Sequence, residues 1–340
     1  MERTKILVTG GAGYIGSHAV VELYEAGFQP IIVDNFANSQ ESALAGIEKI
    51  LGVKVPMHHI DCNDIEALRA VFAEEGSLRG VIHFAAYKAV GESMQKPLEY
   101  YQNNVGSLLT LLQVMREFGV EALVFSSSCT VYGIPDALPV TELTPTKKAN
   151  SPYGATKQMC EDILRDVVGL GSDFRTILLR YFNPIGAHDS ALIGELPLGV
   201  PQNLIPYVTQ TAAGIREQLT IYGDTYDTPD GTNTRDYVHV VDLAKAHVVA
   251  VQRLLDKTSD KVETFNVGTG RGNSVLEVVQ AFERATGVKV NYKIGEPRPG
   301  DVPAIYADVT KSVQELGFST STSLEDSLAS AWKWQLSLSE

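Results

Sequence analysis

In the first half of the chain, short runs of almost continuous apolar residues alternate with longer segments in which apolar residues recur every three to four positions. The short runs have the length and composition of buried strands. They lie at 5–9, 30–33, 53–60, 80–85, 121–126 and 174–181. The intervening segments, such as 15–26 and 98–118, have the period of amphipathic helices. This alternation predicts an α/β protein whose doubly wound parallel sheet, of the Rossmann type, carries helices on both faces.

The pattern changes near position 183, after which the regular elements are shorter. Proline and glycine become frequent at 186–202 and 222–234, which predicts loops. Helical periodicity returns at 241–255, 274–286 and 324–336, and Ser323 and Asp326 have the spacing of a capping box before the last of these. We therefore predict two domains. Residues 1–182 form the Rossmann domain, and residues 183–340 form a second, smaller mixed α/β domain, although a segment near 234–267 returns to the large sheet.

Composition narrows the classes of function. The 340 residues are 44% hydrophobic, and 28 Lys and Arg stand against 41 Asp and Glu, for a net charge of -13. This balance opposes binding to nucleic acid or to an anionic membrane. Three widely spaced cysteines, Cys62, Cys129 and Cys160, favour neither a disulfide framework nor a thiolate metal site. We expect no metal, no signal peptide, no membrane span and a cytoplasmic location.

Three glycines, Gly10, Gly13 and Gly16, follow the first apolar run directly and precede a helical segment. This arrangement is typical of dinucleotide binding, where the glycines allow a tight turn, close approach of a pyrophosphate to a helix N-terminus, and close contact between helix and strand. Glycine-rich turns also occur for structural reasons alone. The motif favours a cofactor only in combination with the strand before it, the helix after it and an acidic residue further along.

Two acidic residues follow later strands. Asp34 ends the second apolar run about 20 residues after the glycines, where a carboxylate can accept hydrogen bonds from the adenosine ribose diol. It would repel a 2'-phosphate, which favours NAD over NADP. The alternative is that Asp34 caps a turn with Asn35. Asp61 follows the third run, and we weigh contact with the adenine edge equally with a helix-capping role.

Tyr153 is the one tyrosine of 14 with a lysine four residues later, Lys157. On a helix this spacing places phenol and ammonium on the same face. A nearby ammonium, together with a nicotinium ring, would stabilise the phenolate, and Tyr153 could then act as a base toward a sugar hydroxyl. The alternative is a buried tyrosine beside a solvated lysine. Three serines, 126–128, end the fifth run at the sheet edge where ligands of doubly wound folds bind, and Ser128 could bond the same hydroxyl.

Together, the glycine triplet, Ser128, Tyr153 and Lys157 resemble the extended short-chain dehydrogenase/reductase superfamily. Longer strings are similar to the UDP-glucose 4-epimerase family within it. They are HFAAYKAVGESM at 83–94, FSSSCTVYG at 125–133, RYFNPIGAH at 180–188 and RDYVHVVD at 235–242. The resemblance extends over nearly the whole chain. It implies an NAD-dependent enzyme that interconverts UDP-glucose and UDP-galactose through a transient 4-keto sugar, and a homodimer formed through the helices near 98–118 and 151–168.

The resemblance also implies roles for single residues. Tyr153 would be the base, Ser128 its partner and Lys157 a ligand of the nicotinamide ribose. The other cofactor residues would be Gly10, Gly13, Tyr14, Ile15, Gly16, Asp34, Asn35, Asp61, Cys62, Phe84, Ala85, Lys88, Asn103, Ser126 and Tyr181. The UDP-sugar would contact Ser128, Tyr153, Asn183, Asn203, Leu204, Tyr222, Arg235, Arg298, Asp301 and Ile305. Asn183, Asn203 and the two arginines would hold the pyrophosphate, and Tyr222 would stack on uracil. The arginines also fit the chemistry of a diphosphate, although either could be an ordinary surface residue.

The resemblance leaves related activities to be separated. Sugar-nucleotide dehydratases of the superfamily place Asp-Glu directly after the catalytic serine or threonine, whereas this chain has Cys129 and Thr130 there, so elimination lacks its acid. Cys129 itself is interpreted as a packed residue, since no histidine lies nearby to activate it. At Ile305 the family has either a large aromatic or a smaller residue, which leaves some UDP-N-acetylhexosamine turnover open. Other UDP-sugar 4-epimerases, a net dehydrogenase and a non-catalytic NAD-binding regulator are the alternatives.

Overall fold

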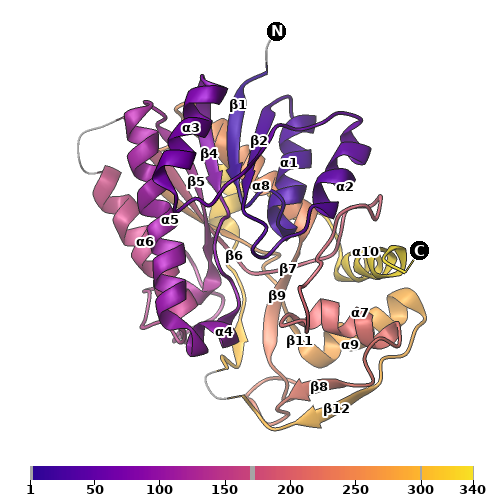
Figure 1. Ribbon diagram of the computed structural model, residues 1–340. Coiled ribbons are helices and arrows are strands. Elements are labelled where there is room, and N and C mark those ends of the chain that lie inside the picture. The colour runs from indigo at the N-terminus through magenta and orange to yellow at the C-terminus, as the bar shows by residue number, and fades with distance from the viewer. Residues whose placement is uncertain (1–2, 169–172, 299–300, 340) are drawn as a thin grey trace.

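The computed structural model describes residues 3–168, 173–298 and 301–339, and its central feature is a seven-stranded parallel sheet (Figure 1). The strand order, β10-β6-β5-β4-β1-β2-β3, has its reversal between β1 and β4, as in doubly wound folds. The strands are β1 (Lys5–Thr9), β2 (Gln29–Asp34), β3 (Met57–His59), β4 (Leu78–His83), β5 (Ala122–Ser128), β6 (Arg175–Tyr181) and β10 (Val262–Val267). The carboxyl ends of these strands meet at one edge, which is where the predicted site residues gather.

Helices cover both faces of this sheet, because successive strand residues point to opposite sides. Ile6 and Val8 pack on the face with α1, α2 and α8, whereas Leu7 packs on the face with α3, α5 and α6. The helices are α1 (Tyr14–Glu25), α2 (Ser42–Leu51), α8 (Val240–Leu255), α3 (Ile65–Glu75), α5 (Pro97–Glu117) and α6 (Pro152–Val168), with the short α4 (Val90–Gln95) beside α5 and α6. The predicted α/β fold with a doubly wound parallel sheet is thereby confirmed.

A smaller region with its own apolar core lies below the carboxyl edge of the sheet (Figure 1). It contains a sheet of β11, β9, β13 and β7, a two-stranded sheet of β8 and β12, and three helices. Its elements are β7 (Asn183–Ile185), α7 (Leu204–Ala212), β8 (Leu219–Tyr222), β9 (Thr234–His239), β11 (Gly272–Ser274), α9 (Val275–Thr286), β12 (Tyr292–Gly295), β13 (Ala304–Ile305) and α10 (Leu324–Ser337). A 3-10 helix at Cys129–Tyr132 and a π-helical turn at Ser312–Leu316 complete the described elements.

The chain crosses between the two regions more than once. β9 belongs to the smaller sheet, but α8, which follows it directly, packs on α1, and β10 pairs with β6 at the edge of the large sheet. The domain boundary near 182 stays a prediction. This crossing matters for the site, because it places β9 and the end of β6 close to the same sheet edge.

Several local expectations need correction. The strand predicted at 53–60 is limited to Met57–His59, since Pro56 has no N–H for a ladder and β3 pairs only with β2. Helix α7 was not anticipated. The capping box predicted at Ser323 is half formed. The Ser323 hydroxyl accepts the Asp326 N–H, which is one half of the box. The Asp326 carboxylate accepts from the Ser323 hydroxyl and not from the Ser323 backbone N–H, so the other half is missing. A complete box begins α9 at Ser274.

No helix in the described ranges has both the length and the apolar character needed to cross a bilayer. Within the same ranges, no group of three or more histidine, cysteine or acidic side chains is placed to hold a metal ion.

Candidate active site

The glycine loop joins β1 to α1 and leaves the N-terminus of the helix open. Gly10 has a φ of +71°, a conformation that favours glycine, and a Cβ there would lie 2.8 Å from the Ala85 nitrogen. A Cβ on Gly16 would lie 2.1 Å from the Gly10 carbonyl oxygen, so the first turn of α1 can pack on the loop only because residue 16 has no side chain. The loop therefore presents backbone N–H groups at a helix N-terminus, a geometry suited to a phosphate.

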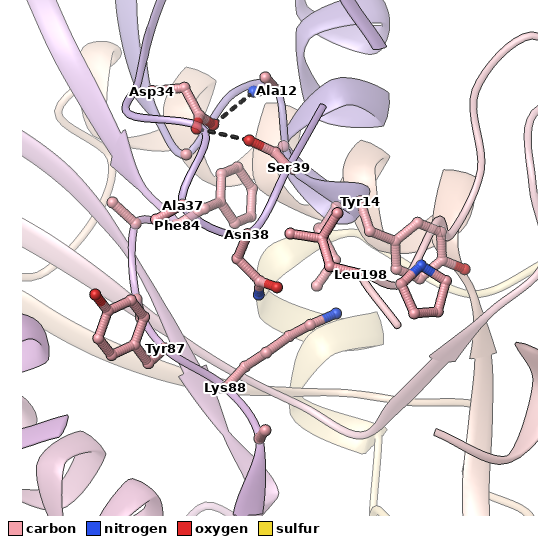
Figure 2. Close-up of a pocket in the computed structure, with 18 of the residues that line it drawn as sticks. Ala12, Tyr14, Asp34, Ala37, Asn38, Ser39, Phe84, Tyr87, Lys88 and Leu198 are labelled. Carbon is pink, nitrogen blue, oxygen red and sulfur yellow. Dashed lines mark hydrogen bonds between the residues drawn. The ribbon is translucent and has the colours of Figure 1, made fainter. Parts of the chain in front are cut away.

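Asp34 has the turn-capping contact that was one of the two roles considered for it. Its carboxylate accepts the N–H of Ala12 in the glycine loop at 3.0 Å and the hydroxyl of Ser39 at 2.8 Å (Figure 2). It also accepts the N–H of Phe36 at 2.9 Å. The Phe36 bond is the turn-capping contact. A carboxylate has about four acceptor positions, so capacity remains for a ligand hydroxyl.

Asp61 does not cap a helix, which corrects one of its two possible roles. Asp64 is the N-cap of α3 and accepts the N–H groups of Glu66 and Ala67. Asp61 instead accepts the N–H and side-chain amide of Asn63 and the amide of Asn35 at 3.1 Å. Partial burial favours the neutral acid, but these hydrogen bonds outweigh it and hold the pKa of Asp61 below its usual value.

A cavity of about 810 Å³ runs along the carboxyl edge of the sheet, and it contains nearly all of the predicted cofactor residues. Figure 2 shows Asp34 with its bonds to Ala12 and Ser39 on one side, and the Lys88 side chain extending into the cavity from another. The predicted residues that line it are Gly10, Gly13, Tyr14, Ile15, Gly16, Asp34, Asn35, Asp61, Cys62, Phe84, Ala85, Lys88, Asn103, Tyr153, Lys157 and Tyr181. Ser126 does not line the cavity, but its hydroxyl hydrogen-bonds the Tyr181 hydroxyl at 2.7 Å.

Tyr153 and Lys157 lie on the first turns of α6, both buried, as their four-residue spacing predicts. The Lys157 ammonium donates to the Ser126 carbonyl oxygen at 2.7 Å and lies 5.9 Å from the Tyr153 ring centroid. Burial lowers the pKa of Lys157 to about 8. Burial also raises the pKa of Tyr153 well above 10, and a hydrogen bond with Ser128 lowers it by less. In the protein alone desolvation of the phenolate therefore prevails, so the expected ionisation of this phenol depends on the nicotinium ring as well as on Lys157.

Most of the predicted substrate residues do not line this cavity, and several of them form two groups. In the first, the Arg298 guanidinium lies 4.8 Å from the Tyr222 ring centroid and donates to Asp301 at 2.9 Å. In the second, Arg235 on β9 pairs with Ile305 on β13, and Ile305 shares an apolar cluster with Cys129. Asn183 begins β7, Asn203 is the N-cap of α7 and Leu204 its first residue. Of the predicted substrate residues, the cavity lining includes Asn203 and Tyr153.

With this geometry described, the chain can be compared with known proteins. Residues 6–268 match the model of the NAD dependent epimerase/dehydratase family. The UDP-glucose 4-epimerase of Dictyostelium discoideum is 51% identical over 97% of this chain and 95% of its own length. The chain belongs to the UDP-glucose 4-epimerase family. A crystal structure of such an enzyme from Bifidobacterium longum, in complex with NAD+ and UDP, has a TM-score of 0.94 at 49% identity and covers 98% of each chain. Another, from Stenotrophomonas maltophila with NAD and formylated UDP-arabinopyranose, has a TM-score of 0.96 at 46% identity and covers 99% of each.

Sequence reasoning missed one wall of the cavity in this member of the family. Residues 192–198 line it, and Glu195 links two predicted site residues, with its carboxylate 3.3 Å from the Lys88 ammonium and 2.6 Å from the Asn203 amide. The Trp334 indole N–H of α10 holds the Glu195 carbonyl oxygen at 2.9 Å. Proline and glycine in this stretch predicted a loop, but no pattern in the sequence indicated that Glu195 would join the two sites.

Cys129 lies beside the site without the character of a nucleophile. Burial raises the pKa of its thiol to about 12, and the nearby Arg235 lowers it by less. A thiol with this pKa stays protonated near neutral pH. The interpretation of Cys129 as a packed residue agrees with this, and it leaves the chemistry of the site to the serine, tyrosine and lysine.

Proposed function

We propose that the protein is an NAD-dependent 4-epimerase that interconverts UDP-glucose and UDP-galactose. The observation that carries the proposal is a single cavity that brings the glycine loop, Asp34, Tyr153 and Lys157 together at the carboxyl edge of the sheet. Membership of the UDP-glucose 4-epimerase family supports the same reaction. A site with these residues is suited to removing a hydride from the sugar next to a base and then returning it. The nucleotide sugar would be held at the far end of the site.

The residues of the cavity fit NAD. The glycine loop offers backbone N–H groups to a pyrophosphate, and Asp34 keeps acceptor capacity for a ribose diol but would repel a 2'-phosphate. Lys88, Asn103 and Tyr181 line the same cavity further along. When bound, NAD supplies a hydride acceptor for C4 of the sugar and returns the hydride in the second half of the reaction.

Tyr153 takes the proton of the C4 hydroxyl as the hydride leaves that carbon, and gives it back when the hydride returns to the opposite face. The Ser128 side chain interacts with Tyr153, which supports a role in holding the same hydroxyl. The protein alone favours the neutral phenol, so ionisation of Tyr153 has to be assisted by positive charge. Lys157, with a pKa near 8, supplies part of that charge, and an oxidised nicotinamide supplies the remainder.

The UDP portion is held by residues of the smaller region. Arg235 and Arg298 are the permanently charged, fork-shaped donors that a diphosphate needs, and Asn183 and Asn203 lie at the starts of β7 and α7 nearby. Arg298 would have to give up or share its bond to Asp301 to take this role. Because the enzyme binds the substrate through its nucleotide, the 4-keto sugar is free to rotate and present its other face.

Elimination is disfavoured at this site. The residues that follow Ser128 are Cys129 and Thr130, neither of which is a carboxylic acid, and the Cys129 thiol is held neutral by burial. After oxidation at C4, re-reduction is the step for which the chain has groups.

UDP-N-acetylhexosamines are a second substrate class. Ile305 is buried in the apolar cluster that includes Cys129, and its side chain is intermediate in size between a large aromatic and a small residue. We propose that UDP-glucose and UDP-galactose are the preferred pair, with some turnover of the N-acetylated sugars.

We further propose a cytoplasmic homodimer formed through α5 and α6. These two helices pack side by side and expose Leu98, Leu109 and Met159, apolar side chains that a partner would cover. Free cysteines at 62, 129 and 160 fit a reducing compartment. Sedimentation or light scattering of the purified protein tests the dimer, and a monomer at micromolar concentration would contradict it.

The test of the reaction is incubation of the purified protein with UDP-galactose and no added cofactor. We expect UDP-glucose to form without net NADH, because the hydride returns within each cycle. Accumulation of NADH would indicate a net dehydrogenase. Absence of any product, with NAD present and bound, would indicate a regulator that only binds the dinucleotide.

A further inference from the structure

Glu161 is a buried carboxylate that the mechanism above does not use. It lies on α6, one turn after Lys157 and two turns after Tyr153, and its side chain is 1% exposed. The Arg180 guanidinium grips it with two bonds, of 2.9 Å to Oε1 and 2.6 Å to Oε2. The Ser127 hydroxyl donates to Oε1 at 2.6 Å, and Arg165 donates to Oε2 at 2.8 Å. A buried charge with this many partners is costly to assemble and strongly oriented.

Two of these partners, Ser127 and Arg180, come from β5 and β6, whereas Arg165 lies on α6 with Tyr153 and Lys157. Ser127 of β5 lies between Ser126, whose carbonyl oxygen accepts from Lys157, and Ser128, which hydrogen-bonds Tyr153. In the sheet register Ser127 is paired with Arg180 of β6. The Glu161 carboxylate therefore joins α6 to β5 and β6 at the level of the site, while its own atoms stay on the opposite side of the strands from the Ser126 and Ser128 side chains.

The network continues beyond the carboxylate. The Arg180 guanidinium lies 4.9 Å from the Tyr132 ring centroid, and the Tyr132 hydroxyl donates to the Asn266 side chain on β10 at 2.6 Å. The next residue after Arg180 is Tyr181, whose hydroxyl bonds Ser126. Arg180 is therefore held from two sides, so α6 is tied to a rigid part of the sheet rather than to a movable loop.

We infer that Glu161 is a positioning residue of the epimerase site, whose carboxylate locks α6 onto the ends of β5 and β6 so that Tyr153 meets Ser128 and Lys157 meets the Ser126 carbonyl. The inference rests on the proposed function, in which these two contacts orient the base and its lysine. A helix held less firmly would let the Tyr153 hydroxyl drift, and displacements of about 1 Å are enough to reduce turnover by about 100-fold.

Glu161 also contributes charge next to Lys157, and its negative charge favours the ammonium form. The pH dependence of the site involves every ionisable group packed around this pair. These are Tyr153, Cys160 and Arg165 of α6, His83 of β4, Arg180 and Tyr181 of β6, and Tyr132 and Glu142 of the segment after β5. Removing the negative charge should lower the pKa of both Lys157 and Tyr153, so the pH profile should move to lower pH.

The experiment uses the full-length holoprotein and a matched control. Glu161→Gln removes the charge, and Glu161→Asp keeps the charge but shortens the reach to Arg180. The control is Glu263→Gln, since the Glu263 carboxylate of β10 likewise accepts two hydrogen bonds from the Arg253 guanidinium of α8, each of 2.7 Å, and lines no part of the cavity. Each variant is assayed for thermal stability, retained NAD, kcat, KM for UDP-galactose and the pH profile of kcat/KM.

We expect Glu161→Gln to lower kcat about 10- to 100-fold with KM changed less than about threefold, and to move the pH profile to lower pH. Glu161→Asp should lower kcat and leave the profile in place. Glu263→Gln should lose comparable stability and keep both kcat and profile. A Glu161→Gln variant as unstable as the control but with unchanged kcat and profile would overturn the inference, because it would give Glu161 a purely structural role.

A double variant covers the case in which Glu161→Gln fails to fold because Arg180 is left unpaired. Glu161→Gln with Arg180→Met removes both charges, and it should fold yet keep the kcat defect; wild-type kcat in this variant would contradict the inference. A readout without turnover separates this inference from the proposed function. Ultraviolet difference titration against matched Tyr153→Phe proteins isolates ionisation of that phenol, and Glu161→Gln should shift it even if the wild type epimerises nothing.

Discussion

The large sheet and the smaller region differ in how they build their parts of the site. The predicted cofactor residues come from successive turns at the carboxyl edge of one sheet, and all but Ser126 line a single cavity. Apart from Ser128 and Tyr153, the predicted substrate residues come from separate strands, loops and helix ends of the smaller region, and Tyr222 is 42% exposed. Strand order brings together the residues at the strand ends, and helices α5 and α6 add Asn103, Tyr153 and Lys157, whereas the smaller region depends on how its loops pack.

This difference predicts separate kinetic consequences. Changes at the sheet edge should affect the chemical step, and changes in the smaller region should affect binding of the nucleotide sugar. The four predictions that follow test this separation, beginning with the largest effect.

Tyr153→Phe should lower kcat by about 10²- to 10⁴-fold, since it removes the group that takes and returns the proton. NAD should still be retained, because Asp34 and the glycine loop are untouched. The measurement is kcat with UDP-galactose together with the dinucleotide content of the purified variant. Tyr292→Phe, at an exposed tyrosine of β12, is the control. Near-normal turnover by Tyr153→Phe would remove that residue from the role of base.

Arg298→Ala should raise KM for UDP-galactose by about 10- to 100-fold and change kcat little, because a charge-assisted contact to the diphosphate is lost. Steady-state kinetics measures both constants. Arg284→Ala, which breaks an exposed ion pair with Glu325, provides a control of equal charge change. A fall in kcat at unchanged KM would contradict the assignment of the chemical step to the sheet edge and of nucleotide-sugar binding to the smaller region.

The pH profile of the wild type tests the sheet edge alone. Burial lowers the pKa of Lys157 to about 8, so the ammonium is present below that pH and is lost as the pH rises through it. If the ammonium supports the phenolate, kcat/KM should fall about tenfold for each pH unit above the lysine pKa. A profile that stays flat to pH 10 would remove Lys157 from this role.

Ile305→Ala should give the smallest effect, a rise of about threefold in the ratio of UDP-N-acetylglucosamine to UDP-glucose turnover, because removing a buried side chain enlarges the pocket without touching the base. Competition assays with both sugars measure the ratio. Ile294→Ala, at an exposed position of β12, is the control. An unchanged ratio would place Ile305 away from the C2 substituent.

The corrections within the site have a common cause. A helix-capping role was considered for Asp61, whereas the start of α3 shows that Asp64 fills this role. Glu195 lies in a stretch that predicted nothing beyond a loop, yet it meets Lys88 and Asn203 because α10 holds its backbone. In each case the role of the residue depends on the neighbours that it contacts when helices, strands and loops pack together. The local sequence pattern does not indicate these neighbours.

The sequence by itself determined the doubly wound fold, the glycine loop and the placement of Tyr153 and Lys157 on one helical face, because these depend on residue spacing along one strand or helix. Only the tertiary structure decided the protonation of those two side chains and the anchoring of their helix by Glu161. A pKa depends on how much water every surrounding element excludes and on charges brought in from distant strands, such as Arg180 on β6. These contributions come from residues that are neighbours in space, and the order of residues along the chain does not show which residues become neighbours.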